Sequence, residues 1–210
     1  MADRPYHHGD LRRELLRQAA GMIEEVGPAR VSLRELARRA GVSHAAPAHH
    51  FGDKTGLLTA IATEGFHLLA DQLTEALKGT GDFLEVGVAY VEFAVTHRAH
   101  FEVMFRPDLY EPDDADVRAA RQRSTTALQS GISAASPEAT GPDARTASLA
   151  AWSMVHGFAS LWITGALPTS LGSDAAAAAR QVAGVLTLGP RGTGRHSAQR
   201  TDDERAAAPR

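Results

Sequence analysis

The chain has 210 residues, with 22 Lys and Arg against 25 Asp and Glu, a formal net charge of −3 and no cysteine. This length suits one large or two small domains, and the lack of Cys excludes disulfide frameworks, thiolate nucleophiles and Cys-based metal sites. No apolar run approaches the roughly 20 residues that span a bilayer, and the polar start of the chain lacks the apolar region of a secretory signal. We therefore expect a cytoplasmic protein without a membrane partner.

The first predicted element is a helix over residues 10–26, which Gly27 and Pro28 end. Its apolar residues recur at helical spacing: Leu11, Leu15, Ala19, Met22, Ile23 and Val26. Residues 1–60 contain more Arg and Lys than Asp and Glu, whereas the rest of the chain is acidic. This asymmetry suits a protein that presents one end to nucleic acid.

Residues 32–54 predict a helix-turn-helix, in which the second helix enters the major groove of DNA. Ser32 and Glu35 have the spacing of a capping box, in which the Ser hydroxyl accepts from the Glu amide and the Glu side chain reaches back. Gly41 supplies the positive φ that closes the first helix. Ser43 is the expected N-cap of the second helix, and Asp53 is that of the helix that follows.

The rest of the chain is predicted to be helical as well, and no segment has a strand pattern, so the fold class is all-α. The predicted helices cover residues 53–79, 82–95, 97–105, 114–133, 144–166 and 173–188, with loops at 107–113 and 136–143. We expect a head over residues 7–66, a body over residues 67–188, and a disordered tail over residues 189–210, which has no apolar periodicity.

The region around the helix-turn-helix resembles the DNA-binding domain of the TetR family of transcriptional regulators, from about Tyr6 to Phe66. The matching residues are Leu36-Ala37, Ala40-Gly41-Val42-Ser43, His50-Phe51 and Asp53-Lys54. Residues 152–157 (WSMVHG) resemble the Trp…His-Gly signature of one subgroup of the family's C-terminal domains. The resemblance implies a regulator that binds double-stranded DNA as a homodimer and responds to a small molecule, with a repressor as the usual role.

The candidate DNA-binding residues lie in and around the second helix: Arg34, Ser43, His44, Ala45, Ala48, His49, His50 and Lys54. His44, His49 and Arg34 are the candidates for base edges, and the small alanines suit thymine methyl groups. Lys54 opens the next helix, where its ammonium and the free backbone amides attract phosphate. The family usually has Tyr, a phosphate contact, where this chain has Ala48.

In the body, bulky residues on several helices suit an apolar cavity with a few polar points. The resemblance implies an effector pocket lined by Phe66, Tyr90, Phe93, His97, Phe101, Met104, Trp152 and His156. Apolar and small residues of the last two helices predict a dimer interface: Ala159, Trp162, Ile163, Ala178, Val182 and Val185.

Two other interpretations remain open from the sequence. The first is a constitutive DNA-binding regulator whose body is a filled core without an effector. The second is an α-helical enzyme, which would depend on His97, His100 and Glu102. We expect no enzyme, catalytic residue or cofactor, because the Gly-x-Ser-x-Gly and His-Glu-x-x-His motifs are absent from the sequence. His97 and His100 share a helical face, so a metal site there stays open although a third ligand is not evident.

Overall fold

A computed structural model of the protein describes residues 8–135 and 141–187, so the predicted tail lies outside the described residues. These residues form nine α-helices and no strand, which confirms the all-α class. The helices are α1 (His8–Val26), α2 (Leu33–Ala40), α3 (Ala45–Phe51), α4 (Lys54–Thr80), α5 (Phe83–Thr96), α6 (Arg98–Met104), α7 (Ala115–Ala135), α8 (Gly141–Ile163) and α9 (Ala175–Thr187). Short 3-10 turns lie at η1 (Pro28–Arg30), η2 (Pro107–Leu109) and η3 (Thr169–Leu171).

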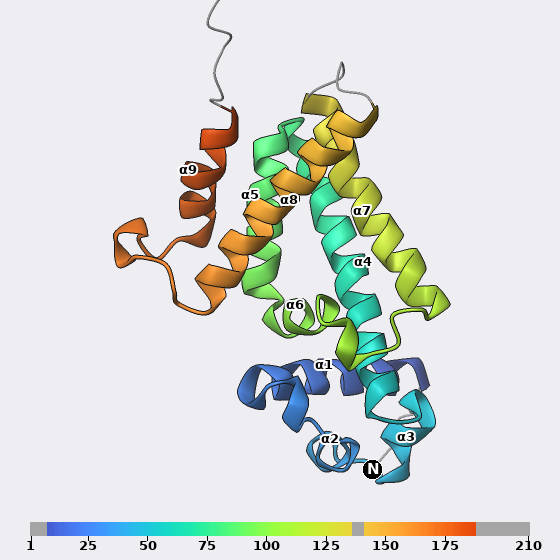
Figure 1. The fold of residues 1–210 in the computed structure, drawn as a ribbon. Coiled ribbons are helices and arrows are strands. Elements are labelled where there is room, and N and C mark those ends of the chain that lie inside the picture. The colour runs from blue at the N-terminus through green and yellow to red at the C-terminus, as the bar shows by residue number, and fades with distance from the viewer. Residues whose placement is uncertain (1–7, 136–140, 188–210) are drawn as a thin grey trace, which may run out of the picture.

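Helices α1, α2 and α3 form a small head below the larger helical body (Figure 1). The predicted cap of α2 is present, since Ser32 Oγ accepts from the Glu35 amide at 3.2 Å and Gly41 ends the helix at φ 65°. The prediction that the Glu35 side chain reaches back to the start of the helix is wrong. The Glu35 carboxylate bonds Arg38, one turn further on, at 2.7 and 2.8 Å, because a charged pair is stronger than a bond to a neutral amide.

The predicted N-cap of α3 is also wrong. His44, in a helical conformation and without a side-chain cap, precedes the first residue of α3, and the Ser43 carbonyl accepts from the Ala46 amide at 3.0 Å. The chain therefore enters α3 through a tight turn made by its backbone. The predicted cap of α4 is confirmed, since Asp53 Oδ1 accepts from the Gly56 amide at 2.9 Å.

Helix α4 is 27 residues long and belongs to both parts of the molecule (Figure 1). Its first turns bury Leu57 and Ile61 in the core of the head, and its later turns bury Leu69 and Leu73 in the body. It packs most extensively on α7 and also on α5 and α6. A displacement of α4 therefore affects head and body together.

Helix α6 lies between the head and the body, where it contacts α1 and η1 on one side and α4 on the other (Figure 1). A Cβ at Gly65 of α4 would lie 3.0 Å from His100 Cβ and 3.2 Å from Met104 Sδ. The absence of a side chain at Gly65 is thus what allows α4 and α6 to approach so closely.

In the body, α5 is buried along most of its length and packs on α4, α8 and α9. Helix α8 begins three residues before its predicted start and ends at Ile163 rather than residue 166, because Gly165 turns the chain at φ 68°.

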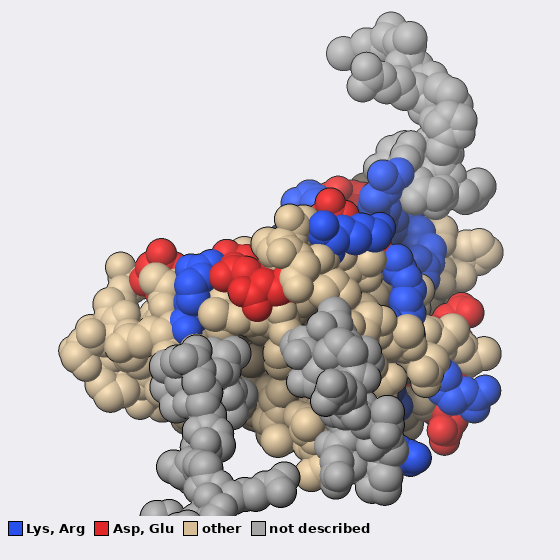
Figure 2. Space-filling view, turned by 90° about the horizontal axis from the view of Figure 1, so that it is seen from above, with Lys and Arg blue, Asp and Glu red and all other residues tan. Residues whose placement is uncertain are grey.

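Seen from above (Figure 2), Lys and Arg side chains lie beside Asp and Glu side chains at several places, and a broad area has neither. Among the described residues, no helix is long and apolar enough to cross a membrane.

Candidate DNA-binding face and ligand pocket

Helix α3 presents one face to the head and the other to solvent. Pro47 and Phe51 are buried, and the Arg12 guanidinium lies 5.4 Å above the Phe51 ring. The structure brings most of the predicted DNA-binding residues together on the exposed side: Ser43, His44, Ala45, Ala48 and His49. Arg34 is exposed on the neighbouring helix α2, and His50 is half-buried with its ring 6.1 Å from that of Phe51. An exposed face of this kind is open to a DNA groove.

Lys54 has a contact that the sequence did not indicate. Its Nζ donates to the backbone carbonyl oxygen of Ala29 at 2.5 Å, which joins the start of α4 to η1. An ammonium group has three donors, so this bond leaves others for phosphate.

The basic excess of the head is partly neutralised within the chain. Arg38 pairs with Glu35 at 2.7 Å, and Arg39 pairs with Glu25 at 2.7 Å. Hydrogen bonds from Arg38 and then Arg39 lower the pKa of Glu35 to about 2. Counting charges in the sequence therefore overstates the number of cations that the head presents to DNA.

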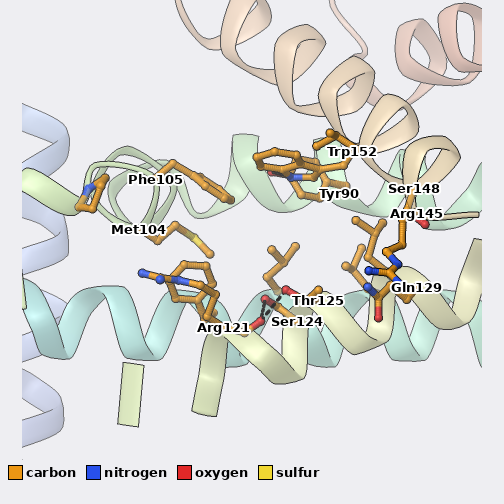
Figure 3. A pocket seen from close by; sticks show the side chains of 16 residues that line it. Tyr90, Met104, Phe105, Arg121, Ser124, Thr125, Gln129, Arg145, Ser148 and Trp152 are labelled. Atoms are coloured by element: carbon orange, nitrogen blue, oxygen red, sulfur yellow. Dashed lines mark hydrogen bonds between the residues drawn. The ribbon is translucent and has the colours of Figure 1, made fainter. Parts of the chain in front are cut away.

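The body contains an open cavity of about 520 Å³ between α4, α7 and α8 (Figure 3). This volume falls in the range of small-molecule sites. Four of the predicted pocket residues lie in its wall: Phe66, Tyr90, Met104 and Trp152.

The other four predicted pocket residues, Phe93, His97, Phe101 and His156, do not line this cavity. Phe93 is fully buried with its ring 5.1 Å from that of His97, and Phe101 is buried against Tyr90 and Phe105. The His156 ring lies 4.6 Å from that of Phe105. Phe101 and His156 therefore contact the wall residues Tyr90 and Phe105 without lining the cavity themselves.

Sequence reasoning missed the contribution of α7, a helix of mostly polar residues. The wall residues outside the predicted set are Leu69, Leu73, Phe105, Pro107, Arg121, Ser124, Thr125, Leu128, Gln129, Arg145, Ser148 and Leu149. For α7 the available signal was the i, i+3, i+4, i+7 spacing of Arg121, Ser124, Thr125 and Leu128, which places them on one helical face.

His97 and His100 lie at the junction of head and body. His100 Nε2 is 3.0 Å from Glu64 Oε2 of α4, and the two His rings are 5.8 Å apart. Within the described residues, no three His, Asp, Glu or Cys side chains come together as metal ligands. Glu102 pairs instead with Arg98 at 3.1 Å.

Two of the predicted dimer residues are inside the protomer. Ala159 is 0% exposed and Ala178 is 1% exposed, because both pack against neighbouring helices of their own chain, so neither reaches a surface. Trp162, Ile163 and Val182 are half-buried, and Leu161, which was not predicted, is exposed. The side chain of Val185 lies outside the described residues.

Comparisons with known proteins cover both parts of the chain. Residues 15–61 match the profile described as bacterial regulatory proteins, tetR family, and residues 83–186 match the tetracyclin repressor-like C-terminal domain. The HTH-type transcriptional regulator BetI of Stenotrophomonas maltophilia (strain R551-3) is 34% identical over 71 residues, which cover 34% of this chain and 36% of that protein.

Solved structures resemble most of the chain. A protein of unknown function from Rhodococcus sp. RHA1 is 33% identical with a TM-score of 0.72, covering 87% of this chain and 96% of its own. The TetR family transcriptional regulator PfmR from Thermus thermophilus is 22% identical with a TM-score of 0.64, covering 82% and 96%. Together the two family matches take in both the helix-turn-helix and the helical body, so this chain belongs to the TetR family of DNA-binding transcriptional regulators, which are not enzymes.

Proposed function

We propose that this protein is a ligand-responsive repressor, which binds a palindromic operator as a homodimer and leaves it when a small apolar or aromatic effector occupies the body. The observation that carries the proposal is the position of the cavity against α4. Phe66 in its wall and Ile61 in the core of the head lie five positions apart on the same helix. An occupant that favours one position of α4 also favours one position of the head.

The mechanism is a shift between two populations. An effector favours the form of the dimer that it binds more tightly, and here that form has a head spacing that does not fit the operator. The free energy of operator binding is then weakened by the difference between the effector's binding free energies for the two forms. This requires two chains, since two heads read two half-sites at a distance set by the dimer. We assign residues 7–66 to the DNA-binding domain and residues 67–188 to effector binding and dimerisation, in a cytoplasmic protein.

The alternative is a regulator whose DNA binding does not respond to any ligand. That alternative needs a filled body, whereas the cavity of about 520 Å³ is lined by aromatic and aliphatic side chains with polar groups among them. The cavity therefore favours the ligand-responsive function.

The test begins with sequencing of DNA fragments that the purified protein retains, which supplies the operator. Small molecules are then screened for loss of operator binding. A hit must lose its effect in Thr125→Trp, which places a large side chain in the cavity wall, and keep it in Thr126→Trp, since Thr126 is exposed on the same helix outside that wall. Tight binding of a single half-site by a protein that stays monomeric at micromolar concentration would contradict the dimer.

A further inference from the structure

The wall of the cavity is charged with one sign only. Two guanidinium groups, those of Arg121 and Arg145, belong to it, and every other wall residue in the described part of the chain is apolar or neutral. They lie towards opposite ends of the cavity (Figure 3): Arg121 near Met104, and Arg145 beside Gln129. A site with this lining opposes a cationic ligand and attracts an anionic one.

Arg121 is held in place without a carboxylate. One of its terminal nitrogens donates to the Tyr110 hydroxyl at 2.8 Å, and its guanidinium lies 5.4 Å from the centre of the Phe66 ring. Tyr110 is itself buried, and its hydroxyl donates to the Met104 carbonyl at 3.0 Å. A half-buried cation is therefore oriented in advance by an aromatic face and a phenol oxygen.

Several other arginines of the described chain differ from Arg121 in this respect. Ion pairs to carboxylates occupy Arg17, Arg38, Arg39, Arg98, Arg106, Arg123 and Arg180. Arg123, two residues along the same helix, pairs with Asp71. Among the described residues no carboxylate lies within ion-pair distance of Arg121, so the chain leaves the charge that faces the cavity uncompensated.

We infer that the cavity takes an amphipathic organic anion, whose acid group binds the Arg121 guanidinium and whose apolar body lies along the aliphatic and aromatic wall. This inference rests on the proposed function and narrows its effector to one chemical class. Arg121 is the anchor rather than Arg145, because Arg145 is exposed and its charge is screened by water. Guanidinium groups also match the planar geometry of acid oxygens, which makes bidentate bonds available.

The position of Arg121 gives the acid group access to the junction with the head. Its guanidinium contacts α4 through Phe66, and through Tyr110 it is linked to the last residue of α6. Both helices pack on the head. An anion that draws Arg121 towards itself therefore acts on the two helices that join the cavity to the DNA-binding domain.

The experiment compares two fluorescent probes with the same aromatic body. These are 1-anilinonaphthalene-8-sulfonate, which is an anion, and N-phenyl-1-naphthylamine, which is neutral. Arg121→Gln is expected to weaken binding of the sulfonate about tenfold or more and to leave the neutral probe within about twofold, which also shows that the variant is folded. Arg121→Lys keeps the charge and should retain part of the preference. Arg118→Gln is the matched control, because Arg118 is exposed on the same helix outside the cavity wall.

The outcomes separate this inference from the proposed function. Binding of both probes that is blocked by Thr125→Trp but insensitive to Arg121→Gln overturns the anion assignment and leaves a ligand cavity in place. Equal weakening of both probes in Arg121→Gln also overturns it, because the residue would then serve only the packing of the wall. Failure of both probes to bind the wild-type protein counts against the ligand-responsive function itself.

Discussion

Tyr90 of α5 and His156 of α8 are joined by a hydrogen bond of 2.9 Å between the Tyr hydroxyl and Nδ1 of the His ring. The same hydroxyl accepts from Trp152 Nε1 at 3.2 Å. An indole nitrogen only donates, so the phenol proton is left for Nδ1, which then accepts as part of a neutral imidazole. Burial also lowers the pKa of His156 and raises that of Tyr90, so both groups favour their neutral forms in the folded protein.

This arrangement predicts how stability depends on pH. The pKa of His156 in the folded state is depressed below its usual value of 6.5, and burial lowers that of His97 in the same way. The unfolded chain then binds more protons than the folded one as pH falls through 6.5, so these residues contribute stability above that pH and lose it below. We expect the urea midpoint to fall between pH 7.5 and 5.5, and to fall less in His156→Gln. An equal or steeper fall in His156→Gln would show that the imidazole is not buried in its neutral form.

The close approach of α4 and α6 gives a second prediction. In Gly65→Ala the new methyl group meets His100 Cβ and Met104 Sδ, so the helices must separate, at a cost of about 1–3 kcal/mol in the free energy of unfolding. Gly79→Ala is the matched control, because that position of α4 has no atom within 4 Å of the new Cβ and gains up to about 1 kcal/mol from helix propensity. Denaturant unfolding of both variants measures the difference, and stabilisation of both by a similar amount would refute the packing argument.

Much of the fold was predictable because its signals are local. Apolar periodicity placed most of the α-helices, the helix-turn-helix pattern placed α3, and the Ser32 and Asp53 caps and the turn at Gly41 marked boundaries. The start of α3 was not predictable, since a backbone turn replaces the Ser43 cap. Gly56 was missed for a similar reason: a Cβ there would lie 1.9 Å from the Phe51 carbonyl oxygen, a contact that only the folded turn creates.

The pocket was only half predictable because its wall depends on which side of each helix faces inward. Bulky aromatics were obvious candidates, but a single sequence does not tell Tyr90, which lines the cavity, from Phe93, which is buried without lining it. Helix α7 is mostly polar, so its residues were not among the pocket candidates. Ala159 and Ala178 failed as dimer residues because small residues allow close packing within a chain as readily as between chains.

Lys54 is predicted to hold a DNA phosphate through the donors that its bond to Ala29 leaves over. Lys54→Ala should weaken binding to the operator and to a scrambled duplex alike, and should lower the salt dependence of log K by about one unit. Binding titrations at several salt concentrations measure both effects.

Lys78→Ala is the control for this variant. It removes the same charge from the last turn of the same helix, in the body, and should change neither affinity nor salt dependence. A loss that is confined to one base position, or a loss of affinity without any change in the salt slope, would mean that Lys54 acts through the Ala29 contact and the placement of η1 instead.

Ala48 carries the last prediction, because it departs from the Tyr that the family usually has at this position. Ala48 is exposed on α3, so the folded head has room for a larger side chain there. A Tyr hydroxyl would reach the DNA backbone, and Ala48→Tyr should raise affinity by roughly 0.5–1.5 kcal/mol if one ordinary hydrogen bond is gained. Phosphate contacts position a protein rather than specify a sequence, so the gain should appear on operator and scrambled duplexes alike.

The competing possibility is that Ala48 is small because it packs against a thymine methyl group or the wall of the groove. Tyr would then clash with the operator, and specific binding would fall while non-specific binding held. Titration of the wild type and Ala48→Tyr against both duplexes distinguishes the two, with thermal unfolding as a check that the exposed substitution leaves the head intact. A drop on the operator alone would make Ala48 a base-reading position and would end the idea of a missing phosphate contact.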